Sequence, residues 1–342
     1  MNLTSDKSGV PGRQLAWLMA ACLMADQFVC PTMQWQQPLT AQWAVLGFAL
    51  QCLLIYALFW LTKNYGEGLN QCLIARVFLL GSLVISLAVE LTQGQRFYET
   101  VQSSVLGMGS FLIVVFAVAF YGVYAGLGAL SRTAFILVIL SGVSLLFLAI
   151  SLLEQLRFTN LQPDTLSIKP IWNGFIHQAS LPTELLIWPL FAAKNKNKQG
   201  FFFGNVVLGL FAMGMFLAIL GEMALGEVYF QQEQPVFTIA RLGGISVFRR
   251  LDALHASVWL MLFLIKTTVY CFAAVQLMEG FNWKLSRHAP FFITVAAVLI
   301  VFVTQRKAVE PWLFFAQQAG LLTAGVSAAI WSAFHRKGGC KQ

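Results

Sequence analysis

The sequence predicts an all-α integral membrane protein with about ten transmembrane helices, arranged as two inverted five-helix repeats whose first and sixth helices are broken. Three observations lead to this prediction. Hydrophobic residues make up 58% of the 342 residues and charged residues only 11%, whereas a soluble domain averages about 25% charged residues. Apolar segments follow one another along the whole chain. The first and the sixth of these segments are interrupted by polar residues or proline.

Ten segments approach the roughly 20 residues that an α-helix needs to cross a bilayer. In chain order they cover residues 15–33, 43–62, 72–91, 104–123, 133–153, 171–191, 201–224, 251–278, 290–303 and 312–334. The fourth and fifth segments are joined tightly through residues 124–132. We therefore expect one permease-like transmembrane domain over residues 1–342, with repeat one at about 13–154 and repeat two at about 169–335.

The distribution of basic residues predicts the orientation of the chain. The net charge is +8, and lysines 194, 196 and 198 fall together in one short connection. Basic residues concentrate in cytoplasmic loops, so this connection is assigned to the inside, although Arg249 and Arg250 oppose the trend. An even number of spans then places both termini in the cytoplasm. The positive charge is explained by membrane topology, and we expect no nucleic-acid partner.

The connection over residues 226–250 is long and polar, and this orientation assigns it to the outer side. It contains Pro235, an amphipathic stretch at 236–242 and a Gly243–Gly244 pair. This pattern predicts a short helical hairpin over the outer mouth of the bundle, and the alternative is a disordered loop.

The two interrupted segments predict a binding site for a small ligand. Backbone groups in hydrocarbon need hydrogen-bond partners, so a broken helix is tolerated only where it is buried in protein or lines a cavity. Interruptions at corresponding places in two repeats indicate where such a cavity lies. The residues expected to line it are Ala25, Asp26 and Gln27 in the first segment, and Ala179, Ser180, Thr183 and Glu184 in the sixth.

Two carboxylates lie at these interruptions. Pro182 predicts that a helix restarts just after it, which places Thr183 and Glu184 in a first turn, where free N–H groups stabilise an anion. Glu184 then either binds a ligand amine or a proton, or acts as a structural cap. Asp26 would repel a ligand carboxylate and attract an amine, or it only forms a local turn.

Lys266 lies in the middle of the eighth segment, too far from either end for its ammonium to reach water easily. The ammonium must therefore meet carbonyl groups or a carboxylate. It either takes the place of a bound cation between the broken helices or forms an ordinary interior ion pair. The remaining charged or titratable positions near span ends are assigned to the membrane interfaces: Arg76, Glu90, Glu154, Asp252 and His255. His177 is either a pH-sensitive gate or an interior histidine with satisfied hydrogen bonds.

Enzyme signatures are absent from the sequence. It contains no phosphate-binding loop, no HExxH and no GxSxG, which are the common markers of nucleotide, zinc and serine hydrolase sites. The six cysteines show no metal-binding spacing. We therefore expect neither an enzyme nor a cofactor or metal site.

Three stretches resemble a known family, the permease-like B-subunits of bacterial spore germinant receptors in the amino acid–polyamine–organocation superfamily. They are residues 126–132 (GLGALSR), residues 181–186 (LPTELL), and residues 235–241 (PVFTIAR) followed by 245–248 (ISVF), 250–254 (RLDAL), Trp259 and 263–266 (FLIK). The order and spacing of these stretches resemble the family, and the length and the number of spans agree with it over the whole chain. The resemblance implies a LeuT-type fold of five plus five helices.

The resemblance also implies a function. Such a protein would sit in the spore inner membrane or the bacterial cell membrane, bind a nutrient such as an amino acid, and signal to an A-subunit that forms an ion channel, beside a lipoprotein C-subunit. The chain departs from the family where small glycines are usual: Ala25 and Asp26 occupy the first break and Thr183 precedes Glu184, while Gly128 replaces a glutamate. These departures favour a ligand that presents an amine, or a member that has lost sensing.

Two other functions are compatible with the same predicted fold. A proton-coupled amino acid or amine transporter would use the cavity in a complete transport cycle. A structural membrane scaffold would keep the fold without using the cavity.

Overall fold

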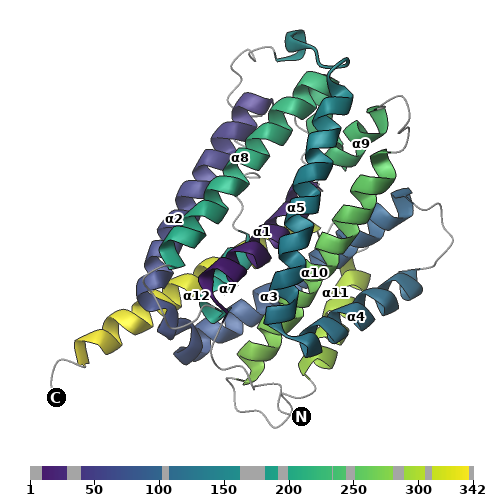
Figure 1. The fold of residues 1–342 in the computed structure, drawn as a ribbon. Coiled ribbons are helices and arrows are strands. Elements are labelled where there is room, and N and C mark those ends of the chain that lie inside the picture. Colours follow the sequence, from purple (N-terminus) through teal and green to yellow (C-terminus); the bar gives the residue numbers. More distant parts are fainter. Residues whose placement is uncertain are drawn as a thin grey trace.

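The structure is a computed structural model that describes residues 10–28, 40–101, 108–161, 182–191, 199–232, 234–243, 251–279, 289–304 and 310–338. Within these residues the regular structure is entirely helical, and the long helices form a bundle (Figure 1). The α-helices are α1 (Gly12–Phe28), α2 (Ala41–Gln71), α3 (Leu73–Val101), α4 (Met108–Ala125), α5 (Leu127–Leu152), α7 (Thr183–Phe191), α8 (Gln199–Leu225), α9 (Pro235–Leu242), α10 (Leu251–Glu279), α11 (Ala289–Thr304) and α12 (Glu310–Gly338). Two short 3-10 helices, η1 (Phe158–Asn160) and η2 (Gly226–Gln231), lie between them.

Each of the ten predicted segments overlaps one of these α-helices, and α9 is an additional α-helix outside the ten segments. Four helices are long and apolar enough to cross a membrane by themselves: 73–101, 127–152, 202–225 and 252–279. Shorter apolar helices at 41–57, 109–125 and 291–301 accompany them. The protein is therefore a multi-pass membrane protein. The inverted-repeat relationship and the cytoplasmic location of the termini remain predictions.

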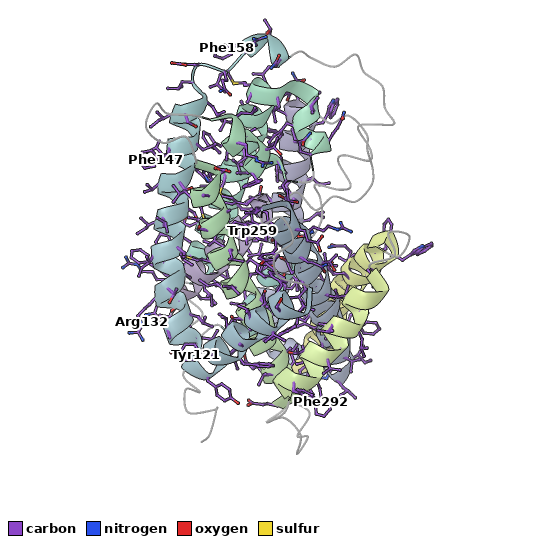
Figure 2. The ribbon with its side chains drawn as sticks, turned by 90° about the vertical axis from the view of Figure 1, so that its right-hand side faces the viewer. Tyr121, Arg132, Phe147, Phe158, Trp259 and Phe292 are labelled. Atoms are coloured by element: carbon purple, nitrogen blue, oxygen red, sulfur yellow. The ribbon has the colours of Figure 1, made fainter. Side chains whose placement is uncertain are left out.

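The outer surface of α5 shows how the bundle meets lipid. Ile136, Ile139 and Leu146 are more than half exposed, and the opposite face of α5 is built from small residues such as Ser141 and Ser144, which are fully buried. Small residues allow helices in a membrane to approach closely, while apolar side chains face the lipid. Figure 2 shows the same division, with Phe147 and Phe292 at the outside and Trp259 in the interior.

Two connections between helices are very short. Gly126, with a φ angle of 84°, separates α4 from α5 by a single residue, so the tight joint predicted at 124–132 is confirmed. Cys72 alone separates α2 from α3. The helix α2 extends past the end of the predicted apolar segment at residue 62, because polar residues mark where the hydrocarbon ends and a helix can continue beyond that point. For the same reason α3 extends to Val101, well past its predicted end at residue 91.

The helix α9 covers one end of the bundle. Pro235 occupies its first turn, where a missing N–H costs nothing, and its inner face is buried at Val236, Phe237 and Ile239. It packs against α10, α8 and η2, as Figure 1 shows for α10. The predicted amphipathic helix is confirmed, and the disordered alternative is wrong for residues 234–243. The hairpin and its location at the outer mouth remain predictions.

The central helix of the bundle is α10. It packs against α1, α3, α4, α5, α7, α9 and α11. In its most apolar 18-residue stretch, 78% is buried, whereas the corresponding stretches of the other three long helices are 39–44% buried. The helix α10 therefore contacts both helices that carry the predicted site residues, α1 and α7.

Candidate functional site

The end of α1 and the start of α7 lie side by side in the interior of the bundle. The helix α7 begins at Thr183, directly after Pro182, as the sequence predicts. The predicted interruption of α1 at residues 25–27 is wrong, because Ala25, Asp26 and Gln27 form the last turn of a helix that continues to Phe28. None of these three residues is a strong helix breaker, so their polarity and position alone did not end the helix.

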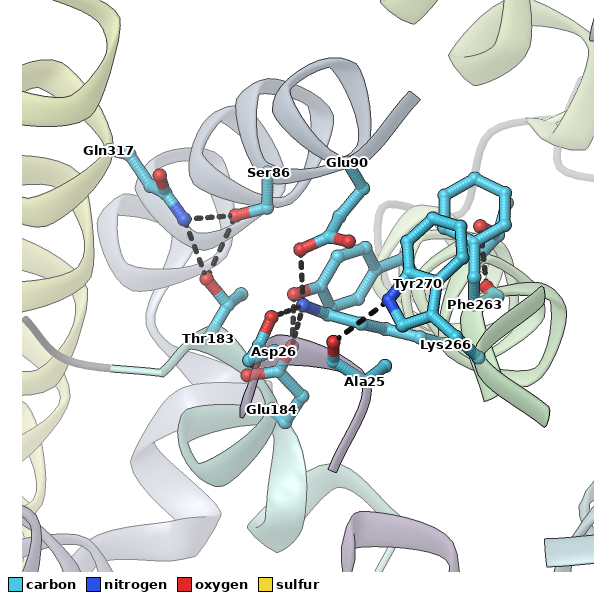
Figure 3. Close-up of polar contacts among 12 residues, drawn as sticks. Ala25, Asp26, Ser86, Glu90, Thr183, Glu184, Phe263, Lys266, Tyr270 and Gln317 are labelled. Atoms are coloured by element: carbon cyan, nitrogen blue, oxygen red, sulfur yellow. Dashed lines mark hydrogen bonds and ion pairs between the residues drawn. The ribbon is translucent and has the colours of Figure 1, made fainter. Parts of the chain in front are cut away.

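Lys266 of α10 lies between these two helix ends and contacts three carboxylates (Figure 3). Its ammonium forms ion pairs with Asp26 of α1 and Glu90 of α3, and its Nζ lies 3.1 Å from Oε1 of Glu184 of α7. The Lys266 side chain is only 2% exposed. One buried cation thus joins four helices.

Glu90 was assigned to a membrane interface from the sequence, and that prediction is wrong. Its side chain is 12% exposed and faces the interior, where it contacts Lys266. The error follows from the helix boundary, because Glu90 lies in the middle of the long helix α3 and not near its end.

Tyr270 completes the charged group, and the sequence analysis missed it. Its hydroxyl donates a hydrogen bond to Oε1 of Glu184, and its ring centroid lies 5.6 Å from Nζ of Lys266. Residues four positions apart share one face of a helix, so the spacing from Lys266 to Tyr270 was the signal that identifies this partner.

The helix ends also stabilise two of these charges. Glu184 lies in the first turn of α7, where the helix dipole favours an anion, and Lys266 contacts the last turn of α1, where the dipole favours a cation. Asp26 is placed less favourably, because it is a carboxylate in that same last turn of α1. Its side chain is also the most open of the group, at 31% exposed.

A second, uncharged group of side chains adjoins the carboxylates. The hydroxyls of Ser86 and Thr183 are 2.8 Å apart, and Gln317 of α12 donates from Nε2 to both of them, at 2.7 and 3.0 Å. Ser86 precedes Glu90 by one helical turn, and Thr183 precedes Glu184 in the chain. The polar network therefore extends from α1 to α12, as Figure 3 shows.

Trp259 holds the end of α1 from the other side. Its indole N–H donates a hydrogen bond of 3.1 Å to the backbone oxygen of Ala25, one of the last-turn carbonyls that lack a partner within the helix. The indole packs against Phe97 in a tilted arrangement at 4.1 Å between ring centroids, and Phe97 packs edge-on against Phe237 of α9 at 5.4 Å. Aromatic rings therefore fill the space between α9 and the end of α1.

The other predicted positions fall in different surroundings. Gln27 is half-buried in the last turn of α1, while Ala179, Ser180 and His177 lie outside the described residues. His255 is 1% exposed, and its Nδ1 lies 2.7 Å from the Ser144 hydroxyl. Its assignment to a membrane interface is therefore wrong, because its side chain faces the interior of the bundle against Ser144 of α5. Three other residues were assigned to the interfaces. Of these, Arg76 and Asp252 are half-buried and Glu154 is exposed.

A metal site is not formed by the described part of the chain. No group of His, Cys, Asp or Glu side chains among those residues has an arrangement that would hold a metal ion. The three carboxylates around Lys266 already surround an ammonium. These carboxylates can bind a proton, or an organic cation that competes with the Lys266 ammonium for them.

Comparison with known proteins identifies the family. Residues 70–309 match the family model described as spore germination protein, of the spore permease type. This range includes Glu90, Glu184, Lys266 and Tyr270, whereas Asp26 and Gln317 lie outside it. The search of curated proteins found no match. Because the family model covers well over half of the chain, this protein belongs to the spore germination permease family.

Proposed function

We propose that this protein is the ligand-binding membrane subunit of a spore germination receptor. A small nutrient, an amino acid or an amine, binds between the end of α1 and the start of α7, and the signal passes to a partner channel subunit. The family supports a role in germination. The observation that carries the proposal is the buried contact of Lys266 with carboxylates from three helices.

The same contact supplies a mechanism. Lys266 holds α1 and α7 against α10 through Asp26 and Glu184. A ligand that binds either carboxylate competes with this ammonium and changes how firmly the two helix ends are held. A ligand shifts a conformational equilibrium only by its difference in affinity for the two states. Competition for these carboxylates provides such a difference.

The charges favour the amine over the amino acid. Three carboxylates face one ammonium, and Asp26 is the partly exposed member. A ligand ammonium at Asp26 gains a charge-assisted hydrogen bond. A carboxylate on the same ligand is repelled by the neighbouring Asp26 and Glu90. We therefore expect an amine to bind more tightly than the amino acid from which it is derived by loss of the carboxyl group.

A thermal-shift measurement on the purified full chain tests the ligand site. The probes are matched pairs, phenylalanine with 2-phenylethylamine and leucine with isoamylamine. We expect stabilisation by the amines, and Asp26→Asn weakens their binding by about 10- to 150-fold, because a hydrogen bond to a charged group contributes about 1.5–3 kcal/mol. Glu99→Gln is the matched control, because Glu99 is an exposed carboxylate on α3. Absence of a shift with every probe contradicts the ligand site.

The receptor role needs a separate experiment. We expect the tagged protein, purified from spore membranes, to bring with it a channel-forming A-subunit and a lipoprotein C-subunit. Deletion of its gene removes germination in response to the ligand found above, and reintroduction of the wild-type gene restores it. Purification of the chain without these partners, together with normal germination of the deletion strain, contradicts the receptor role.

A proton-coupled amine or amino acid transporter is the second candidate. The observation that favours it is the group of ionisable side chains deep in the bundle, because interior carboxylates are typical of proton pathways in membrane transporters. Uptake of labelled isoamylamine into proteoliposomes that contain this chain alone, driven by a pH gradient, would support transport. Binding without uptake favours the receptor.

A further inference from the structure

The charges around Lys266 do not balance. Asp26, Glu90 and Glu184 contribute three carboxyl groups and Lys266 contributes one ammonium. If all four groups were ionised, the interior would carry two uncompensated negative charges. An unpaired charge at membrane depth is strongly unfavourable, and a buried group usually changes its protonation state instead.

Glu184 is the carboxylate whose surroundings offer the most stabilising contacts to a negative charge. It is 1% exposed, lies in the first turn of α7, and accepts a hydrogen bond from the Tyr270 hydroxyl. Hydrogen-bond donors and the positive end of a helix both stabilise a carboxylate. Glu184 and Lys266 therefore form an ion pair with no net charge. The carboxyl groups of Asp26 and Glu90 are in excess of this pair.

Neither of these two additional carboxyl groups has equivalent support. Asp26 lies in the last turn of α1, where the helix dipole disfavours a negative charge. Glu90 lies in the middle of α3, away from either helix end. Both contact the same Nζ atom, so they are neighbours. Two adjacent carboxyl groups do not readily ionise together, and such pairs share a proton in other proteins.

We infer that Asp26 and Glu90 form a proton-binding pair beside the Glu184–Lys266 ion pair, and that the pair holds at least one proton near neutral pH. The proton exchanges with water through Asp26, whose side chain is 31% exposed, whereas Glu90 is 12% exposed. The other titratable groups that act on this pair among the described residues are Cys22 on α1, Glu184 on α7, and Lys266 and Tyr270 on α10.

The inference has a consequence for ligand binding, and this consequence alone rests on the proposed function. An ammonium that binds at Asp26 supplies the positive charge that the shared proton had supplied. The proton then leaves to water as the amine binds, so that one positive charge replaces another. Binding of one amine is therefore accompanied by release of about one proton, as expected when a ligand and a proton compete for a carboxylate.

Infrared spectroscopy of the reconstituted full chain tests the proton directly. A protonated carboxyl group has a C=O stretching band separate from those of carboxylates and amides, and the band shifts in heavy water. We expect the difference spectrum between wild type and Glu90→Gln near neutral pH to show loss of such a band. Asp26→Asn gives the same loss, because a shared proton requires both partners, and it serves as the second variant if Glu90→Gln does not fold.

Glu99→Gln is the control, because it removes an exposed carboxylate from the same helix as Glu90. It leaves the band unchanged if the band belongs to the interior pair. The inference is overturned if Asp26→Asn and Glu90→Gln both keep every protonated-carboxyl band of the wild type. The result is independent of ligand binding, since a band that is lost in both variants supports the pair even if no amine binds. Conversely, amine binding without the band leaves the proposed function intact and removes the proton site.

Discussion

The Nζ atom of Lys266 lies 3.1 Å from Oε1 of Glu184, and this ion pair joins the central helix α10 to the first turn of α7. Both side chains are almost completely buried. The chain begins a helix just after Pro182 and places a carboxylate where the free N–H groups of that helix stabilise it. The lysine that neutralises this carboxylate comes from a helix about 80 residues later in the chain.

Removal of the positive charge at Lys266 is the first prediction. We expect Lys266→Met to lower the free energy of unfolding by about 3–5 kcal/mol, because loss of one partner leaves buried carboxylates without a cation. Lys266→Arg keeps the charge and is less damaging than Lys266→Ala. The triple variant with Asp26→Asn, Glu184→Gln and Lys266→Met recovers part of the loss. Denaturant unfolding in detergent measures these changes.

The control for this series is Arg132→Met, which removes an exposed cation from α5 and is expected to have little effect. Equal stability of Lys266→Met and the wild type would show that the buried ion pairs do not hold the helices together. Equal function of the Ala and Arg variants would remove the charge of Lys266 from the mechanism.

Loss of the indole N–H of Trp259 is the second prediction. Trp259→Phe keeps an aromatic ring against Phe97 and leaves the backbone oxygen of Ala25 without its donor. An unsatisfied buried acceptor costs about 1–3 kcal/mol. We expect faster amide hydrogen exchange in the last turn of α1, measured by mass spectrometry. Trp17→Phe, in α1 itself and packed against Phe135, leaves this exchange unchanged.

The predictive value of the sequence differs between the helices and the site. The positions of the long apolar helices followed from apolar length, and the start of α7 followed from Pro182, because proline lacks the N–H that a continuing helix needs. Lys266 was recognised because an ammonium at membrane depth needs a partner. Its partners were not, since the contacts of Asp26 and Glu90 with Lys266 depend on how separate helices pack.

Glu90 shows the limit most clearly. Hydropathy detects the edge of the hydrocarbon, and the segment that contains Glu90 loses its apolar character near residue 91. The helix continues to Val101, so a residue that hydropathy places at an edge lies in the middle of the bundle. Ser86 and Gln317 were missed for a related reason, because uncharged polar residues are common at membrane interfaces and within spans alike, and only the packing of α3 against α12 brings them together.

Restoration of a backbone donor at the start of α7 is the third prediction. Pro182→Ala supplies an N–H and removes the steric barrier to helix at the preceding residue. We expect the helix to extend towards its N-terminus, which moves the positive end of the dipole away from Glu184 and weakens the response to ligand. A concentration series of isoamylamine in the thermal-shift assay measures the response. A curve that matches the parent protein would show that the start of α7 does not depend on this proline.

Close packing of α3 and α12 gives the fourth prediction. A Cβ atom at Gly320 would overlap the Ser82 hydroxyl oxygen and would lie 3.5 Å from the backbone oxygen of Phe78. We expect Gly320→Ala to push the two helices apart and to destabilise the protein by about 1–3 kcal/mol, as overpacking usually does. Because Gln317 reaches Ser86 across this same interface, the displacement also weakens ligand binding.

A second substitution separates steric overlap from other effects at this interface. In the double variant Ser82→Ala with Gly320→Ala, the overlapping oxygen is gone, and the remaining Cβ of residue 82 lies 3.6 Å away, an ordinary van der Waals contact. We expect this variant to regain most of the stability that Gly320→Ala loses, apart from the hydrogen bonds of the Ser82 hydroxyl to backbone oxygens. Gly81→Ala, on α3 where nothing lies within 4 Å, is the control. A double variant as unstable as Gly320→Ala alone would show that overlap at Ser82 is not the cause.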